Sequence, residues 1–197
     1  MSKVKICGLS RQDDIDAVNH SLPDYIGFVF AESRRKVDAK TAAMLKAGLD
    51  KRIKAIGVFV NQDIDYISAL FKNGTIDFVQ LHGEEDTAYM KRLRKSCDAP
   101  ILKALRIGAF MPNIPEGADY LLFDTASVHR GGSGKSFDWN ILSGYSGIPY
   151  FLAGGLDISN VLEAVHLLNP YCVDVSSGVE TNGVKDPVKI DEFVRMV

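Results

Sequence analysis

Short apolar runs alternate along the first half of the chain with longer segments in which apolar residues recur every three or four positions. The apolar runs have the length and the flanks of buried strands, and they lie at Val4–Leu9, Tyr25–Phe30, Lys54–Val60 and Phe78–His82. The segments between them have helical spacing, as in Ile15, Val18 and Leu22. Strands that alternate with helices predict a parallel sheet covered by helices.

The second half continues this pattern with one interruption. Four more strands are expected, at Ile101–Ile107, Tyr120–Asp124, Tyr150–Gly155 and Cys172–Ser177. Between Gly108 and Asp119, Pro112 and Pro115 leave no room for a regular helix, because proline lacks the backbone donor that a helix interior needs. A short helix is expected at Asp138–Ser143 after the sixth strand.

Eight strand–helix units favour a closed (β/α)8 barrel, the TIM-barrel architecture of the α/β class. The competing fold is an open doubly wound sheet, which usually carries a GxGxxG turn after its first strand, and Cys7-Gly8-Leu9 lacks that turn. We therefore expect one compact barrel domain over residues 1–197, with the helix after the fifth strand reduced or absent. The 197 residues are fewer than the roughly 250 of a typical barrel, and the proline-interrupted segment accounts for part of the difference.

Two helix starts are also predicted. Ser10 followed by Asp13 resembles a capping box at the start of the first helix. Asp186-Pro187 predicts the last helix, with aspartate as N-cap and proline at the first helical position.

Composition and charge exclude several classes of protein. The formal net charge of −2 leaves no basic footprint for nucleic acid or for a membrane surface, and no apolar stretch approaches the roughly 20 residues of a membrane span. The three cysteines are few and widely spaced, which argues against a disulfide framework and for a reducing, cytoplasmic compartment; they are Cys7, Cys97 and Cys172. No spacing of cysteine or histidine predicts a metal site.

Active sites of barrels lie at the carboxyl ends of the strands, where Cys7 and Asp124 are found. Because side chains alternate along a strand, Lys5 and Cys7 should point inward while Val4 and Ile6 face the helices. A thiol and a carboxyl across one barrel mouth suit a proton-shuttling isomerase, in which one group takes a proton and the other gives one. The alternatives are that Cys7 is a small buried hydrophobe and that Asp124 is a helix cap or loop anchor.

Other polar residues at the strand ends are candidates for substrate binding. The glycine-containing ends of strands seven and eight suit a phosphate, whose candidate ligands are Gly154, Gly155, Ser177 and Gly178. The Gly131–Gly134 loop is either a mobile lid or an unstructured connection.

Arg34 and Arg35 follow the second strand, where a guanidinium would bind a substrate carboxylate, unless they form a solvated basic turn. His82 is expected to contact substrate or to pack at the rim. Lys5 and Asp174 should lie together inside the barrel, because strands one and eight touch and each charge would relieve the burial cost of the other. Asp174 could instead reach a sugar hydroxyl.

Together these residues resemble the phosphoribosylanthranilate isomerases of tryptophan biosynthesis, and the resemblance covers essentially the whole chain. Its motifs occur in order, and the most specific combination is Lys5-Ile6-Cys7-Gly8 at the start with Ser176-Ser177-Gly178-Val179-Glu180 at the end. Between them lie Gln80-Leu81-His82-Gly83, Phe123-Asp124-Thr125 and Ala153-Gly154-Gly155. The family usually has Ser-Pro-Arg where this chain has Ser33-Arg34-Arg35, so Arg34 could share or take the role of Arg35.

The resemblance implies a cofactor-free Amadori rearrangement of N-(5'-phosphoribosyl)anthranilate by a monomer or a homodimer. It implies that Asp124 is the general acid that opens the furanose ring and that Cys7 is the general base that removes the C2 proton. Arg35 is then expected to hold the anthranilate carboxylate. Two alternatives are a different phosphosugar isomerase, such as the histidine-pathway enzyme for a similar aminoaldose, and a barrel that binds phosphorylated metabolites without catalysis.

Overall fold

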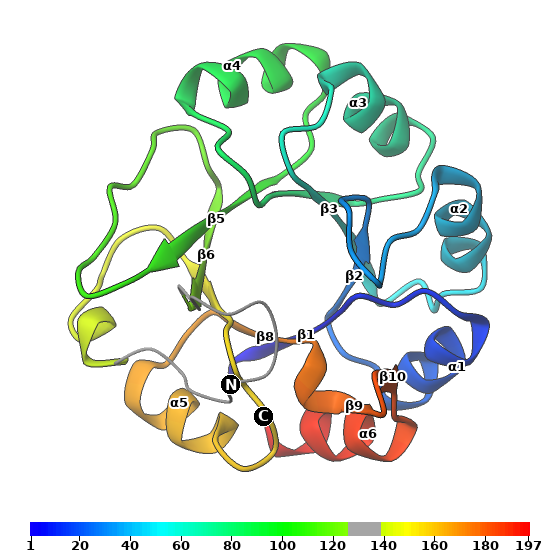
Figure 1. The fold of residues 1–197 in the computed structure, drawn as a ribbon, viewed down its shortest axis with the longest axis vertical. Helices are drawn as coiled ribbons and strands as arrows, with labels where there is room; N and C mark the ends of the chain where they lie inside the picture. Colours follow the sequence, from blue (N-terminus) through cyan, green and yellow to red (C-terminus); the bar gives the residue numbers. More distant parts are fainter. Residues whose placement is uncertain (126–138) are drawn as a thin grey trace.

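The structure is a computed structural model that describes residues 1–125 and 139–197. Within these residues, strands β1 to β8 form a closed parallel barrel in which each strand pairs with its neighbour in sequence and β1 pairs with β8 (Figure 1). The sequence prediction of a closed (β/α)8 barrel is therefore confirmed, and the open doubly wound sheet is excluded.

The elements alternate as the hydrophobic pattern predicts. The barrel strands are β1 Lys3–Cys7, β2 Tyr25–Val29, β3 Lys54–Phe59, β4 Phe78–Leu81, β5 Ile101–Ile107, β6 Tyr120–Thr125, β7 Tyr150–Leu152 and β8 Cys172–Val175. The helices are α1 Gln12–Ser21, α2 Ala39–Ala47, α3 Ile64–Lys72, α4 Thr87–Ser96, α5 Val161–Leu168 and α6 Pro187–Met196, with 3-10 helices η1 Trp139–Leu142 and η2 Ser177–Val179. A small hairpin, β9 Glu180–Thr181 with β10 Val184–Lys185, follows β8.

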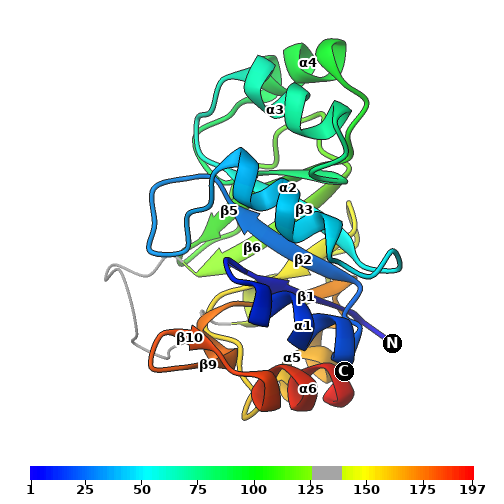
Figure 2. The same ribbon diagram turned by 90° about the vertical axis from the view of Figure 1, so that its right-hand side faces the viewer.

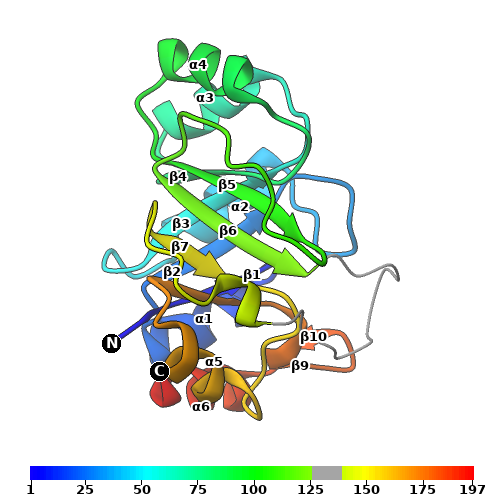
Figure 3. The same ribbon diagram turned by 90° about the vertical axis from the view of Figure 1, so that its left-hand side faces the viewer.

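The helices lie around the outside of the barrel (Figure 1). No helix connects β5 to β6, as the prolines in that segment predict. In the two side views the strand arrows point toward the end of the barrel that carries the β9–β10 hairpin, and both chain termini lie nearer the opposite end (Figures 2 and 3). The carboxyl ends of all eight strands therefore surround one mouth.

Side-chain alternation sorts the strands into two faces. Val4 and Ile6 of β1 belong to the buried layer between barrel and helices. A separate cluster of inward-facing aliphatic and aromatic side chains includes Tyr25, Leu122 and Phe151. This cluster packs inside the barrel, apart from the layer between barrel and helices.

The helix starts differ partly from expectation. The predicted capping box at Ser10 and Asp13 is wrong by one residue, because Arg11 is the N-cap and the Asp14 carboxylate accepts from the backbone N–H groups of Ser10 and Arg11. Asp186 caps α6 with Pro187 in the first turn, as predicted.

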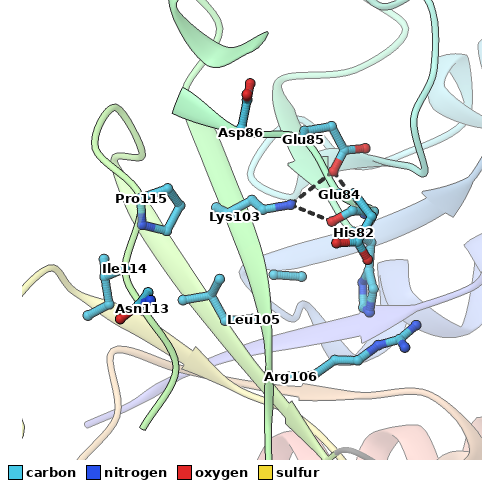
Figure 4. A pocket seen from close by; sticks show the side chains of 12 residues that line it. His82, Glu84, Glu85, Asp86, Lys103, Leu105, Arg106, Asn113, Ile114 and Pro115 are labelled. Atoms are coloured by element: carbon cyan, nitrogen blue, oxygen red, sulfur yellow. Dashed lines mark hydrogen bonds and ion pairs between the residues drawn. The ribbon is translucent and has the colours of Figure 1, made fainter. Parts of the chain in front are cut away.

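A buried ion pair fixes the loop between β4 and α4, beside the mouth. Glu85 accepts hydrogen bonds from the backbone N–H groups of Asn61 at 2.6 Å and Gly83 at 2.8 Å. The Lys103 ammonium of β5 donates to Glu85 at 2.9 Å and to the Gly83 carbonyl at 2.7 Å (Figure 4). Burial raises the pKa of Glu85, but these hydrogen bonds outweigh it and hold the pKa below its ordinary value.

Lys103→Met should destabilise the protein by about 3 kcal/mol, because removing one partner leaves a buried carboxylate without its counter-charge. Urea unfolding at neutral pH measures the change, and the exposed Lys51→Met is the matched control, expected within about 0.5 kcal/mol of the parent. Equal stabilities of the two variants would contradict the proposed role of the pair.

Candidate active site

A cavity of about 440 Å³ opens at the carboxyl ends of the strands. Side chains or backbone from most of the sequence-predicted site residues line it; these are Cys7, Arg35, His82, Asp124, Gly154, Gly155, Asp174 and Ser177. Gly178 lies outside this lining. The barrel topology thus brings together residues that are as many as 170 positions apart, Cys7 to Ser177.

Cys7 and Asp124 occupy inward positions at the ends of β1 and β6. The Cys7 thiol is partly accessible from the mouth, whereas Cys97 and Cys172 are buried. The Asp124 side chain is 31% exposed, and its Oδ2 lies 3.4 Å from Nε2 of His82. One nucleophilic side chain and one carboxyl therefore face the same cavity from different strands.

The loops after β7 and β8 make a backbone-rich wall of the cavity. Gly154 and Gly155 both have positive φ, at 88° and 69°, a conformation that side-chain-bearing residues rarely adopt. A Cβ at Gly178 would lie only 2.0 Å from the Leu156 carbonyl oxygen, so glycine is required for the two loops to touch. The predicted Gly131–Gly134 loop lies outside the described residues.

Arg34 and Arg35 both bind the carboxylate of Glu180, beside the mouth of the barrel. The Arg35 guanidinium donates from Nε and Nη2 to the two oxygens of Glu180 at 2.7 and 2.9 Å, and Arg34 donates to the same carboxylate at 2.7 Å. Arg35 lines the cavity and is 23% exposed, while Arg34 is 58% exposed and lies outside the lining. A guanidinium has five donors, so Arg35 retains donors for a ligand.

A polar chain lies along the wall of the cavity. Lys5 and Asp174 form the predicted contact, with the ammonium 2.8 Å from Oδ2. The same ammonium donates to Oε1 of Gln80 at 2.6 Å, and Gln80 Nε2 lies 2.8 Å from Nδ1 of His82. A second cavity of about 380 Å³ adjoins the first at His82 and includes Lys103, Arg106 and Ile114 (Figure 4).

Comparisons with known proteins show the family of the chain. The family model described as N-(5'-phosphoribosyl)anthranilate (PRA) isomerase matches residues 4–196. The chain belongs to the phosphoribosylanthranilate isomerase family. It is therefore an enzyme, an isomerase of tryptophan biosynthesis, as the motifs predict.

Similar members of the phosphoribosylanthranilate isomerase family span the full chain. The N-(5'-phosphoribosyl)anthranilate isomerase of Endomicrobium trichonymphae is 52% identical over 198 residues, covering 100% of this chain and 98% of that protein. The solved phosphoribosyl anthranilate isomerase of Thermotoga maritima superposes with a TM-score of 0.86 at 31% identity, covering 100% and 98% of the two chains. Another, solved in complex with reduced 1-(o-carboxyphenylamino)-1-deoxyribulose 5-phosphate, has a TM-score of 0.80 at 28% identity and covers 99% and 97%.

Within residues 1–125 and 139–197 of this isomerase, no group of three or more His, Cys, Asp or Glu side chains is arranged to hold a metal ion. None of the helices in those ranges is long and apolar enough to cross a membrane.

The residue patterns alone did not single out Lys185 or the role of Glu180. Lys185 is buried and donates to Glu180 at 2.9 Å and to the Ser176 carbonyl at 2.8 Å. Glu180 is the last residue of the Ser176–Glu180 motif, and its place in that motif was the one feature of the sequence that pointed to it. The position of Lys185 depends on the β9–β10 hairpin returning the chain toward Ser176, and no local sequence pattern encodes that return.

The surroundings of Cys7 have opposing effects on the pKa of its thiol. Burial raises the pKa of the Cys7 thiol above its ordinary value, and the charges of Lys5 and Lys185 oppose that rise. The thiolate is the reactive form, so its fraction should increase steadily with pH.

Alkylation of Cys7 by iodoacetamide should accelerate as the pH rises through and beyond the ordinary thiol pKa of about 8.5. Lys185→Met should move this rise to higher pH, because it removes a cation that stabilises the thiolate. Modified-peptide mass spectrometry measures the rate, and Cys7→Ser shows which modification belongs to this thiol. A rate that is independent of pH, or a shift to lower pH in Lys185→Met, would contradict this account.

Proposed function

We propose that the cavity converts N-(5'-phosphoribosyl)anthranilate to 1-(2-carboxyphenylamino)-1-deoxyribulose 5-phosphate without a cofactor, with Asp124 as general acid and Cys7 as general base. The observation that carries the proposal is that the two side chains line one cavity together with a glycine-rich wall and an arginine. The relative solved with the reduced product analogue supports a phosphosugar ligand of this chemistry.

The proposed reaction begins with protonated Asp124, which gives its proton to the furanose ring oxygen. The C1–O bond breaks, and the anthranilate nitrogen lone pair forms the protonated Schiff base at C1. The Cys7 thiolate then removes the proton from C2, and the electron pair of that C–H bond moves to give the enolamine. Protonation at C1 and loss of the enol proton complete the ketone, so no redox partner is needed.

The cavity walls supply matching groups for the rest of the substrate. We assign the phosphate to the backbone N–H groups of Gly154, Gly155, Ser177 and Gly178, because glycine loops after the last two strands suit an anion. Asp174 lines the cavity, and its buried Oδ1 has no hydrogen-bond partner within the described residues. That oxygen is suited to accept a hydrogen bond from a sugar hydroxyl, since an unpaired buried acceptor is costly. His82 would contact the reacting end of the sugar beside Asp124.

We also propose that the chain works as one barrel domain over residues 1–197, as a monomer or homodimer in the cytoplasm, with no nucleic-acid partner. The pairing of β1 with β8, which joins both ends of the chain in one barrel, supports a single unit. The three separate free thiols and the formal net charge of −2 agree with the compartment and with the absence of a nucleic-acid partner.

Cys7→Ser and Asp124→Asn should each lower kcat by about 100-fold or more, the usual contribution of a general acid or base. The loss of phosphoribosylanthranilate fluorescence measures turnover, and thermal unfolding checks that both variants remain folded. Cys97→Ser and the exposed Asp98→Asn make the same chemical changes away from the cavity, and wild-type turnover is expected for both. Turnover near the wild-type rate in either site variant would show that the acid or base lies elsewhere.

Arg35→Ala should raise KM by roughly 10- to 100-fold with a smaller change in kcat, the effect of losing a charge-assisted hydrogen bond to the substrate carboxylate. Arg34→Ala is the matched control, because both guanidinium groups bond Glu180 but only Arg35 lines the cavity. The same fluorescence assay gives both constants. A larger KM effect in Arg34→Ala would transfer the carboxylate-binding role to that residue.

A further inference from the structure

A series of polar side chains crosses the barrel along the wall of the cavity, from Asp174 through Lys5, Gln80 and His82 to Asp124, and all of them except Lys5 line the cavity. The successive separations are 2.8, 2.6, 2.8 and 3.4 Å. Lys5, Gln80 and Asp174 are buried, while His82 and Asp124 are partly exposed in the mouth. The series therefore links the protein interior to the carboxyl that we assign as the acid.

The first link fixes the orientation of the Gln80 amide. Burial lowers the pKa of Lys5, but the facing Asp174 carboxylate outweighs this and holds the pKa above its ordinary value, so Lys5 is an ammonium. An ammonium only donates hydrogen bonds, and its partner on Gln80 must be the carbonyl oxygen Oε1. The NH2 group of the same amide is then directed to His82.

The second link fixes the tautomer of His82. The amide nitrogen of Gln80 only donates, so Nδ1 of the ring, 2.8 Å away, must accept. A neutral imidazole that accepts at one nitrogen carries its proton on the other. The proton of His82 is thus on Nε2, the nitrogen that lies 3.4 Å from Asp124 Oδ2.

We propose that Gln80 is a positioning residue that holds His82 as the neutral Nε2–H tautomer, with its N–H directed at Asp124. This inference rests on the proposed role of Asp124 as the general acid. When Asp124 gives its proton to the ring oxygen, a carboxylate forms at the edge of the cavity. The His82 Nε2–H lies 3.4 Å from Oδ2 of that carboxylate, close enough to stabilise the charge electrostatically as it develops.

The opposite tautomer would work against ring opening. With the proton on Nδ1, Nε2 would present a lone pair to Asp124, and the nascent carboxylate would face a second acceptor. Lys5 prevents this arrangement indirectly, because rotating the Gln80 amide would set its NH2 group against the ammonium. Through Gln80, the buried Lys5 ammonium thereby determines that Nε2 of His82 carries the proton on the side of Asp124.

The ring tautomer is measured directly in the substrate-free protein by long-range nitrogen–proton correlation NMR, with His82→Asn identifying the resonances among the four histidines. The expected wild-type result is an unprotonated Nδ1 and a protonated Nε2 at neutral pH. A protonated Nδ1 in the wild type would overturn the proposal whether or not Asp124 is the acid, which Asp124→Asn tests separately.

Gln80→Glu then tests the consequence for catalysis. A carboxylate at this position keeps the hydrogen bond with Lys5 but accepts on both sides, so Nδ1 of His82 should become protonated. We expect kcat to fall about tenfold, the value of one hydrogen bond to a charged group, with KM within about twofold of wild type. The exposed Gln12→Glu makes the same charge change on α1 and should alter neither kcat nor the tautomer. Unchanged kcat in Gln80→Glu, or a proportional loss through KM alone, would overturn the positioning role.

Discussion

The ion pair between Lys5 and Asp174 is the interaction on which the upper half of the barrel depends. The two residues are Cα partners in the β1–β8 register, the pairing that closes the barrel. Two charges inside a barrel are costly unless they pair and find further hydrogen bonds, and Lys5 does both through Asp174 and Gln80. The strand pairing that closes the barrel therefore also brings the two charges of the polar interior together.

At the rim of the barrel the charges are reversed, because there a buried carboxylate is surrounded by cations. The almost fully buried carboxylate of Glu180 gathers three cations, Arg34, Arg35 and Lys185. Burial alone would raise the pKa of Glu180, but the hydrogen bonds and positive charges of Arg35 and Lys185 outweigh burial and hold the pKa below its ordinary value. The cluster therefore places an arginine in the cavity wall and a lysine near Cys7 by means of one acceptor.

Sequence reasoning predicted those features that follow from periodicity and topology. Alternation along β1 and β6 predicted the inward positions of Cys7 and Asp124, and the touching of strands one and eight predicted the Lys5–Asp174 pair. It did not predict contacts that depend on the path of an irregular loop or hairpin between the strands and helices. The N-cap of the first helix is Arg11 rather than Ser10, and the Asp14 carboxylate reaches back to the backbone N–H groups of both residues. Lys185 reaches the end of β8 only because the β9–β10 hairpin returns the chain toward Ser176.

The same distinction explains why Gln80 carried no signal of its own. An inward glutamine at mid-strand reads as a satisfied core amide, and only the positions of Lys5 on one side and His82 on the other give it a direction. The direction matters because an amide has distinct donor and acceptor ends, whereas an apolar residue of similar volume would separate the same neighbours without orienting either. A buried amide between a fixed cation and an imidazole ring can thus determine which ring nitrogen carries the proton. The cation acts through two successive hydrogen bonds rather than by direct contact with the ring.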